Sequence, residues 1–121
     1  MKLNIWPFAL IIYTDWSLKD WEWGDCWGPV IFIRPEHRDD PGIEAHELTH
    51  ACQFWEFLGL GFLILYYCHQ RSRFAFEAAA YRAQLACSPF PARQRSVYAK
   101  LLVDNYNLGI TYDAAFASLR E

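Results

Sequence analysis

His46 and His50, four residues apart with Glu47 between them, form the pattern in this chain that has the clearest chemical use. On an α-helix, side chains at positions i and i+4 share one face, with Cβ atoms about 5–6 Å apart. Two imidazole nitrogens at that separation can bind one zinc ion at roughly 2.0–2.1 Å. The glutamate then faces the open side of the metal, where it can act as a base. The spacing therefore predicts a zinc site with Glu47 as a catalytic residue.

The residues around this motif indicate a buried helix that starts just before it. Within residues 43–52 the only acidic or basic side chains other than histidine are Glu44 and Glu47, and a helix that points into a core needs such a composition. Upstream, residues 39–42 (Asp-Asp-Pro-Gly) supply acidic capping groups and a proline that is tolerated in a first turn. We expect the helix to start near Pro41 and to carry the motif in its second turn.

The third ligand of such a site must come from another part of the chain, because a catalytic zinc ion usually has three protein ligands and a water. Glu77 is the first candidate, since a lone carboxylate among aromatic and alanine residues is costly to bury unless a cation neutralises it. The alternative to a ligand role is that Glu77 forms a salt bridge or lies exposed on its helix. Glu56, six residues beyond His50, and His69, in a polar turn, are the other candidates. On a continuous helix Glu56 would point about 240° away from His50, which favours Glu77.

Strands come first in the sequence pattern and helices follow. Residues 4–13 and Val30–Ile33 are rich in β-branched and aromatic residues and predict two strands. The tryptophan-rich stretch between them, residues 16–27, is expected to form a hairpin loop whose aromatic side chains either pack or line a substrate site. After the motif helix, the predicted helices are residues 74–87, 92–106 and 111–119. The predicted fold class is α+β, with a short N-terminal antiparallel sheet or hairpin followed by about four helices.

Length and composition indicate one domain over residues 1–121. A chain of 121 residues, 54% of them hydrophobic, is long enough for a single core and too short for a two-lobed protease. A net charge of −3 argues against a nucleic-acid-binding protein, which would carry a basic surface. The four cysteines include no CxxC pair, which favours free thiols in a reducing compartment and a cytoplasmic location.

The most apolar stretch, residues 57–68, is too short to be a transmembrane span. Its twelve residues would cover about 18 Å as a helix, against a hydrocarbon core of roughly 30 Å. We expect this segment to lie in the core, with contact to a membrane surface or a partner groove as the alternative. The apolar run near the N-terminus is interrupted by Asn4 and Pro7 and lacks a cleavage site, so a strand is expected there and not a signal peptide.

The motif and the segment around Glu77 together resemble a known family. The sequence HELTH at residues 46–50, followed by FEAAAYRAQ at residues 76–84, is similar to the minimal gluzincins, which are small zinc metallopeptidase-like proteins of bacteria and their phages. The resemblance covers roughly residues 30–85 and implies a minimal zincin-like core. The chain lacks the large second lobe of the best-known gluzincins.

This resemblance implies a site and a reaction. Zinc would be bound by His46, His50 and Glu77, and Glu47 would be the general base in the hydrolysis of peptide bonds. The resemblance also implies an edge strand before the motif helix, at Val30–Ile33, along which a peptide or protein substrate would lie extended.

The developing negative charge on a substrate carbonyl needs a donor besides the metal, and Tyr81, one turn after Glu77, is the candidate. Two other classes of protein remain open. One is a non-catalytic, metal-stabilised accessory protein that binds a partner through its aromatic surface. The other is a membrane-surface protein that acts through residues 57–67. The oligomeric state is not indicated by the sequence.

Overall fold

A four-stranded sheet and five α-helices make up the fold, which the computed structural model describes for residues 1–120. The sheet comes first in the chain and the helices follow, so the predicted α+β class is confirmed. The strands are β1 (Lys2–Asn4), β2 (Ala9–Tyr13), β3 (Gly24–Trp27) and β4 (Val30–Ile33). A 3-10 turn at Pro35–His37 leads into the helices α1 (Pro41–Glu56), α2 (Leu60–Cys68), α3 (Gln70–Ala86), α4 (Pro91–Asn105) and α5 (Tyr112–Ser118).

The sheet is mixed, whereas the sequence predicted an antiparallel one. Its strand order is β1-β2-β4-β3, with β2 and β4 parallel in the centre and the two edge strands antiparallel to their neighbours. The cause is a tight hairpin in which β3 returns into β4 across Gly28 and Pro29. Gly28 supplies the positive φ of 62° in this two-residue turn. Strand β4 therefore enters the sheet between β3 and β2.

Three strand predictions are corrected by this topology. Residues 4–13 contain the last residue of β1, a turn and β2, and not one strand, because residues 5–8 turn the chain back. The last part of the predicted hairpin loop is strand β3. Val30–Ile33 was expected at an edge, but β4 pairs along its whole length with β2 on one side and β3 on the other. Its backbone groups are used within the sheet, and the edge strand that contacts α1 is β3.

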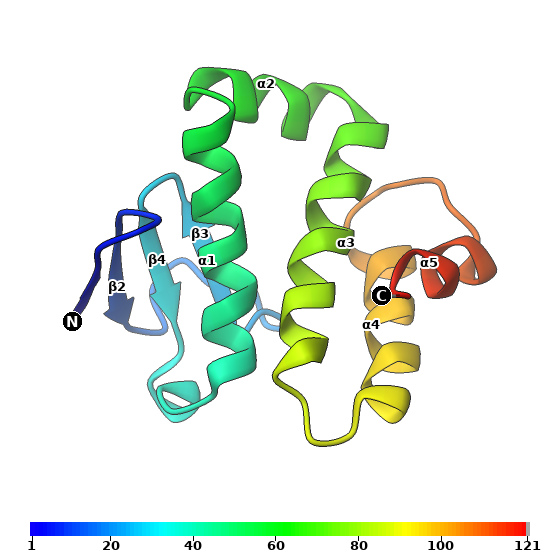
Figure 1. The fold of residues 1–121 in the computed structure, drawn as a ribbon, viewed down its shortest axis with the longest axis horizontal. Helices are drawn as coiled ribbons and strands as arrows, with labels where there is room; N and C mark the ends of the chain where they lie inside the picture. Colours follow the sequence, from blue (N-terminus) through cyan, green and yellow to red (C-terminus); the bar gives the residue numbers. More distant parts are fainter. Residues whose placement is uncertain (121) are drawn as a thin grey trace.

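Helix α1 lies between the sheet and α3 (Figure 1). It starts at Pro41, as predicted, because the Asp40 carboxylate accepts hydrogen bonds from the backbone N–H groups of Gly42 and Ile43. Ile43 and Ala51 pack against buried alanine and isoleucine side chains of β2 and β4. The sheet thus fixes one side of the helix and leaves the motif histidines directed toward α3.

Helix α3 contacts α1 closely and carries a second core. A Cβ atom on Gly42 of α1 would lie 3.2 Å from the Gln84 side chain of α3. Helix α3 also packs with α4 and α5 in a cluster of buried residues: Tyr81, Leu85, Tyr98, Ala99, Leu102, Leu108, Ala115 and Leu119. The helix starts at Gln70, one turn before the predicted residue 74, because the His69 side chain accepts a hydrogen bond from the backbone N–H of Ser72.

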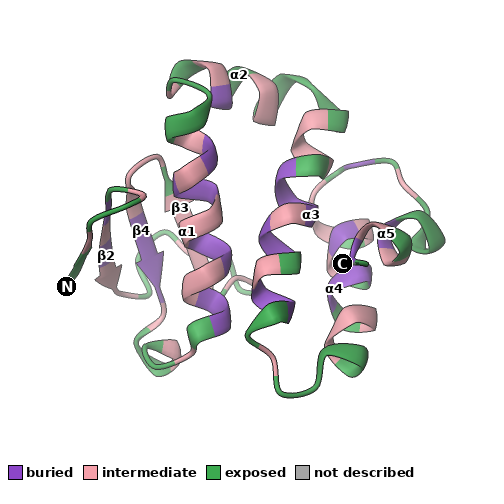
Figure 2. Cartoon of the chain, viewed as in Figure 1, coloured by how far each residue is buried: buried purple, intermediate pink, exposed green. Residues whose placement is uncertain are grey.

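Helix α2 lies across the ends of α1 and α3 and is largely exposed (Figures 1 and 2). Only Phe62 of its nine residues is buried, so the prediction that residues 57–68 form a core segment is wrong. A bend of 115° between α1 and α2 turns one face of α2 toward the other helices and leaves the opposite face uncovered. In the described part of the chain, no single helix is long and apolar enough to cross a membrane.

The second core holds α3 in place, and its contribution can be measured with a matched pair of variants. Leu102 is fully buried, so Leu102→Ala is expected to lower the free energy of unfolding by about 2–5 kcal/mol in urea denaturation. Leu60 is 69% exposed, and Leu60→Ala is expected to change the free energy of unfolding by no more than about 0.5 kcal/mol. Equal effects of the two substitutions would contradict the described packing.

Candidate metal centre

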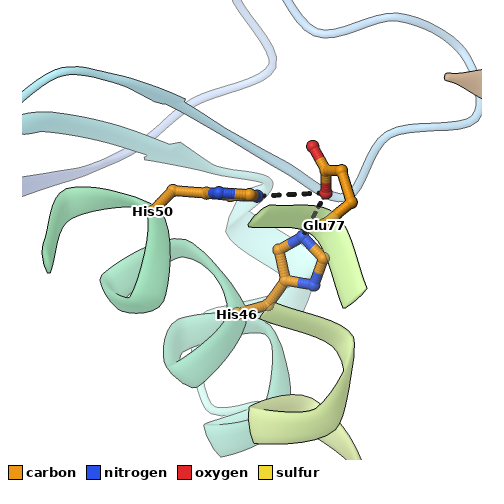
Figure 3. A group of neighbouring side chains, drawn as sticks. All are labelled: His46, His50 and Glu77. Atoms are coloured by element: carbon orange, nitrogen blue, oxygen red, sulfur yellow. Dashed lines mark hydrogen bonds and ion pairs between the residues drawn. The ribbon is translucent and has the colours of Figure 1, made fainter. Parts of the chain in front are cut away.

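Side chains from α1 and α3 converge at one buried point. His46, His50 and Glu77 each offer a ligand atom, and these atoms lie within 4.8 Å of one another. Oε1 of Glu77 is 3.1 Å from Nε2 of His50 and 3.5 Å from Nε2 of His46. Figure 3 shows both rings directed at this one oxygen. Of the three candidates for a third ligand, the structure brings Glu77 to the two histidines.

The two separations between Glu77 and the histidines suit a tetrahedral cation site. Ligands about 2.0–2.1 Å from a tetrahedral zinc ion are separated from one another by about 3.3–3.4 Å. The distances from Glu77 to His50 and His46 lie on either side of that separation. Two imidazoles and one carboxylate are also a ligand set of catalytic zinc, in which the fourth position is left for water or substrate. The residues present therefore fit zinc.

A side-chain amide fixes the proton of His50. Nε2 of Gln53 donates a hydrogen bond to the backbone carbonyl of Phe76, so its Oε1 faces Nδ1 of His50, 3.0 Å away. Nδ1 must then carry a proton and donate it to Gln53, which leaves Nε2 to face Glu77. A bare nitrogen lone pair opposite a carboxylate oxygen is repulsive. A proton or a metal ion between the two atoms removes the repulsion.

Burial and close charges shift the titration of all three groups. Burial lowers the pKa of His50, but the Glu77 carboxylate raises it by more, to about 9. Burial raises the pKa of Glu77, yet His50 and His46 outweigh it and hold this pKa well below its usual range. Burial lowers the pKa of His46, which favours its neutral ring. The cluster thus favours one shared positive charge, and a metal ion can replace the His50 proton.

Tyr66 of α2 holds the second oxygen of Glu77. Its hydroxyl donates a hydrogen bond to Oε2, which leaves Oε1 as the atom directed at the histidines. An outer partner of this kind orients a metal ligand, and its loss typically lowers metal affinity by about 10–100-fold. Tyr66 was not predicted as a site residue. The available signal was its hydroxyl within an uncharged apolar stretch, because a buried tyrosine usually needs a hydrogen-bond partner.

Glu47 lies beside the cluster, against strand β3. A Cβ atom on Gly24 would lie 3.2 Å from Oε1 of Glu47, so the glycine leaves room for this carboxylate. Oε2 of Glu47 and Nδ1 of His46 are buried without a hydrogen-bond partner among residues 1–120. Burial raises the pKa of Glu47 to about 8, with His50 opposing the shift. A buried carboxyl group with an unused oxygen and a pKa near neutrality is suited to proton transfer.

A cavity of ≈ 460 Å³ opens beside these residues and has two different walls. Both histidines, Glu47 and Glu77 line it. One wall is β3 with the residues before it, and it includes the acids Glu22 and Asp25. The other wall comes from α1 and α2 and is apolar and aromatic: Phe54, Phe62, Leu63, Tyr66 and Tyr67. Among the described residues no lysine or arginine lines this cavity, so its charge favours cations.

Tyr81 stands behind His46 and does not line this cavity. Its ring contacts the His46 ring edge-on, with centroids 4.4 Å apart. Its hydroxyl is hydrogen-bonded to the hydroxyl of Tyr106, 2.7 Å away, and Tyr106 does line the cavity. The role of Tyr81 as a donor to the substrate stays a prediction. Of the two tyrosines, only Tyr106 lines this cavity.

The two other candidate ligands lie away from the cluster. Glu56, at the end of α1, is exposed and accepts a hydrogen bond from the Cys52 thiol. His69 is exposed between α2 and α3, where its ring caps α3. Neither belongs to the group of converging ligand atoms.

Known proteins add no second line of support for this site. No protein-family profile matches the chain, and no curated protein or solved structure matches it. The resemblance to minimal gluzincins therefore stays a prediction. The chemistry of the site rests on the geometry of its own side chains.

The choice between the three candidate ligands can be tested by zinc binding. Glu77→Ala is expected to lower zinc affinity by more than the roughly 10–100-fold typical of an outer partner, because it removes a direct ligand. Glu56→Ala and His69→Ala are matched controls and should bind zinc like the wild type. Competition with a chromophoric chelator measures all four proteins. If Glu77→Ala kept full zinc affinity and one of the controls lost it, the third ligand would be Glu56 or His69 and not Glu77.

The shifted groups also predict how stability depends on pH when zinc is removed with a chelator. His50 has a folded pKa of about 9 against 6.5 when unfolded, and Glu47 about 8 against 4.5. Both shifts are upward, so the folded state binds more protons than the unfolded state, and this stabilisation is lost as the pH rises. Between pH 6.5 and about 8 the free energy of unfolding should fall by about 3 kcal/mol, with His50 and Glu47 contributing about equally.

Urea denaturation at the two pH values measures this change. The double variant Glu47→Gln, His50→Gln should lose most of the decline, because neither position then titrates. The lowered pKa of Glu77 acts below pH 6.5, and the lowered pKa of His46 opposes the decline by less than about 0.5 kcal/mol. A stability that rises over this interval in the chelated wild type would contradict the described charge arrangement.

Proposed function

We propose that the protein is a zinc-dependent metallopeptidase that hydrolyses peptide bonds with Glu47 as the general base. The observation that carries this proposal is the convergence of His46, His50 and Glu77 beside Glu47 at the wall of an open cavity. Structural zinc sites are closed by four protein ligands. This group offers three ligands and faces a cavity, which is the arrangement that a catalytic site requires.

The division of work follows from what each side chain contacts. Zinc, when bound, supplies a water with a pKa of about 7 and polarises a carbonyl group. Glu47 would be the base that holds and transfers the proton, and its unpartnered Oε2 is the atom available for this exchange. Gln53 and Tyr66 hold His50 and Glu77 in orientation before a substrate binds.

An extended peptide fits along the edge of β3. We assign the binding of an extended peptide to β3 and not to Val30–Ile33. Strand β3 is an edge strand, and it passes directly beside Glu47 at Gly24. The backbone N–H of Cys26 is bonded to the Asp25 side chain and not to another strand. A peptide added here gains backbone hydrogen bonds and is led past the base, while the apolar wall of α1 and α2 receives its side chains.

A tyrosine pair is our candidate for stabilising the charge on the substrate carbonyl. Tyr106 lines the cavity, and Tyr81 is bonded to it. When Tyr81 donates to Tyr106, the proton of Tyr106 is free to turn toward the cavity and donate to a carbonyl oxygen. In this proposal Tyr81 is a positioning residue and Tyr106 is the donor.

One observation favours a second candidate function. Large aromatic and apolar side chains are exposed over the β1–β2 loop and α2, which suits a metal-stabilised accessory protein that binds a partner without turnover. Such a protein would bind zinc and hydrolyse nothing. For either function we propose a cytoplasmic location, which suits the four free cysteines.

Replacing the base separates these two functions. Glu47→Gln is expected to retain stoichiometric zinc, because the substitution leaves the three ligands intact. It should lower the cleavage of an unstructured protein such as casein by a factor of about 10²–10⁴. Elemental analysis and a fluorogenic casein assay measure the two properties.

Glu56→Gln, at an exposed position outside the cluster, is the matched control and should keep both properties. Cleavage that survives Glu47→Gln would contradict the assigned base. Zinc binding by a wild-type protein that cleaves no peptide would favour the accessory function.

A further inference from the structure

Helix α2 has two apolar faces, and the fold uses only one of them. Phe62 and Tyr66, four residues apart, face the other helices, where Tyr66 reaches Glu77. The outer face follows the i, i+3, i+4, i+7 spacing of a single helix stripe, and its residues are 40–70% exposed: Leu60, Leu63, Ile64 and Tyr67. A helix that is apolar on all sides is normally covered on all sides. The outer stripe is therefore a surface that the chain itself leaves uncovered.

Leu58, in the turn before α2, occupies a backbone conformation that leucine disfavours. Its φ is 57°, in the left-handed region that favours glycine and asparagine. No packing within the chain offsets this strain, because the side chain is 88% exposed. The left-handed turn itself ends α1, because it lets the backbone N–H of Gly59 donate to the carbonyl of Phe54, but this turn does not require a leucine side chain. The leucine is thus placed for contact with something outside the chain.

A second exposed apolar segment lies at the same end of the molecule. In the loop between β1 and β2, Ile5 and Trp6 are 86% and 72% exposed. Trp55 joins this loop to the turn before α2, because its indole N–H donates to the carbonyl of Phe8 and their rings are in edge contact. We call the combined surface the apolar rim, made of the exposed side chains of residues 5–8, Trp55 and residues 58–67.

Charged side chains lie only at the border of the apolar rim, which suits contact with the surface of a bilayer. Neither residues 3–14 nor residues 57–68 contain a charged side chain. The carboxylate of Glu56, which lies next to the rim, accepts a hydrogen bond from the Cys52 thiol. Arg71, exposed just beyond α2, has no hydrogen-bond or ion-pair partner for its side chain within residues 1–120. The rim therefore combines an uncharged apolar surface with one anion, Glu56, and one cation, Arg71, at its border.

We propose that the apolar rim docks the protein onto the surface of a phospholipid bilayer, with the outer face of α2 in the plane of the membrane. The nine residues of α2 cover about 13.5 Å, so the helix lies in the interface and does not cross a hydrocarbon core of roughly 30 Å. A deformable lipid surface admits side chains that project from two separate turns without preformed hollows. Trp6, Trp55 and Tyr67 suit the headgroup level, and Arg71 meets lipid phosphates.

Docking would bring the cavity to the membrane surface. Leu63 and Tyr67 belong to both the apolar rim and the cavity lining, so the cavity opens next to the docked face. A docked protein would act on polypeptide at or beside the lipid. The docking itself depends neither on zinc nor on hydrolysis, because no rim side chain is a proposed ligand or base.

Vesicle sedimentation tests the proposal on the full chain. The wild type should bind vesicles of phosphatidylcholine and phosphatidylglycerol. The double variant Leu58→Asn, Ile64→Gln should bind at least about tenfold more weakly, because each substitution removes a large apolar side chain from the lipid contact. Leu58→Asn alone should weaken binding without lowering stability, since asparagine tolerates the positive φ. Val97→Gln, an exposed apolar position on α4 outside the rim, is the matched control.

Two further measurements test whether vesicle binding depends on Arg71 and whether it depends on the metal centre. Arg71→Glu should weaken binding to the anionic vesicles and leave binding to pure phosphatidylcholine vesicles unchanged. Chelated wild type and Glu47→Gln should bind vesicles like the wild type, so a failure of the proposed peptidase activity leaves this result intact. Vesicle binding that is equal in the double variant and the wild type would overturn the proposal. A lipid-independent dimer in sedimentation velocity that the double variant dissociates, with no vesicle binding, would also overturn it.

Discussion

Two imidazoles and a carboxylate, all of them buried side chains at the wall of the cavity, share one positive charge, and the rest of the structure is built around this constraint. Glu77 is 2% exposed, and an ionised carboxylate buried alone would be strongly destabilising. Helix α1 delivers both histidines because the sheet fixes its opposite side. Helix α3 delivers the carboxylate because a second core, with α4 and α5, fixes it from behind. The shared charge therefore lies where helices fixed by two different hydrophobic cores pack against each other.

Hydrogen bonds from Gln53 and Tyr66, which are not among the three converging residues, connect three helices at the site. Gln53 connects His50 of α1 to the backbone of α3, and Tyr66 connects α2 to Glu77. Helix α2 thus supports the site with one face while its other face lies open at the surface. A contact made on that outer face acts on a helix that directly holds a ligand side chain. In the arrangement that we propose, membrane docking and the orientation of Glu77 would both involve the same nine-residue helix.

Local patterns in the sequence were sufficient for the parts of the site that lie within one helix. The four-residue spacing placed the two histidines, capping by Asp40 placed the start of α1, and the unusual composition around Glu77 pointed to the third member. Strand order was not predictable in this way, because β3 has the sequence Gly-Asp-Cys-Trp, which lacks a strand signature, and its pairing moved β4 into the interior. Apolar composition predicted burial of α2 wrongly, since composition does not tell which face has a neighbour. The roles of Gln53 and Tyr66 depend on contacts between helices.

The zinc K-edge absorption spectrum of the zinc-loaded protein tests the central claim most directly, because it reports the ligand types around the metal without any assumption about turnover. The account predicts one zinc ion with imidazole scattering from two histidines, together with oxygen ligands, at about 2.0–2.1 Å. A spectrum dominated by sulfur at about 2.3 Å, or the absence of imidazole scattering, would contradict the account, since zinc would then be bound by cysteines or nonspecific groups and not by His46, His50 and Glu77.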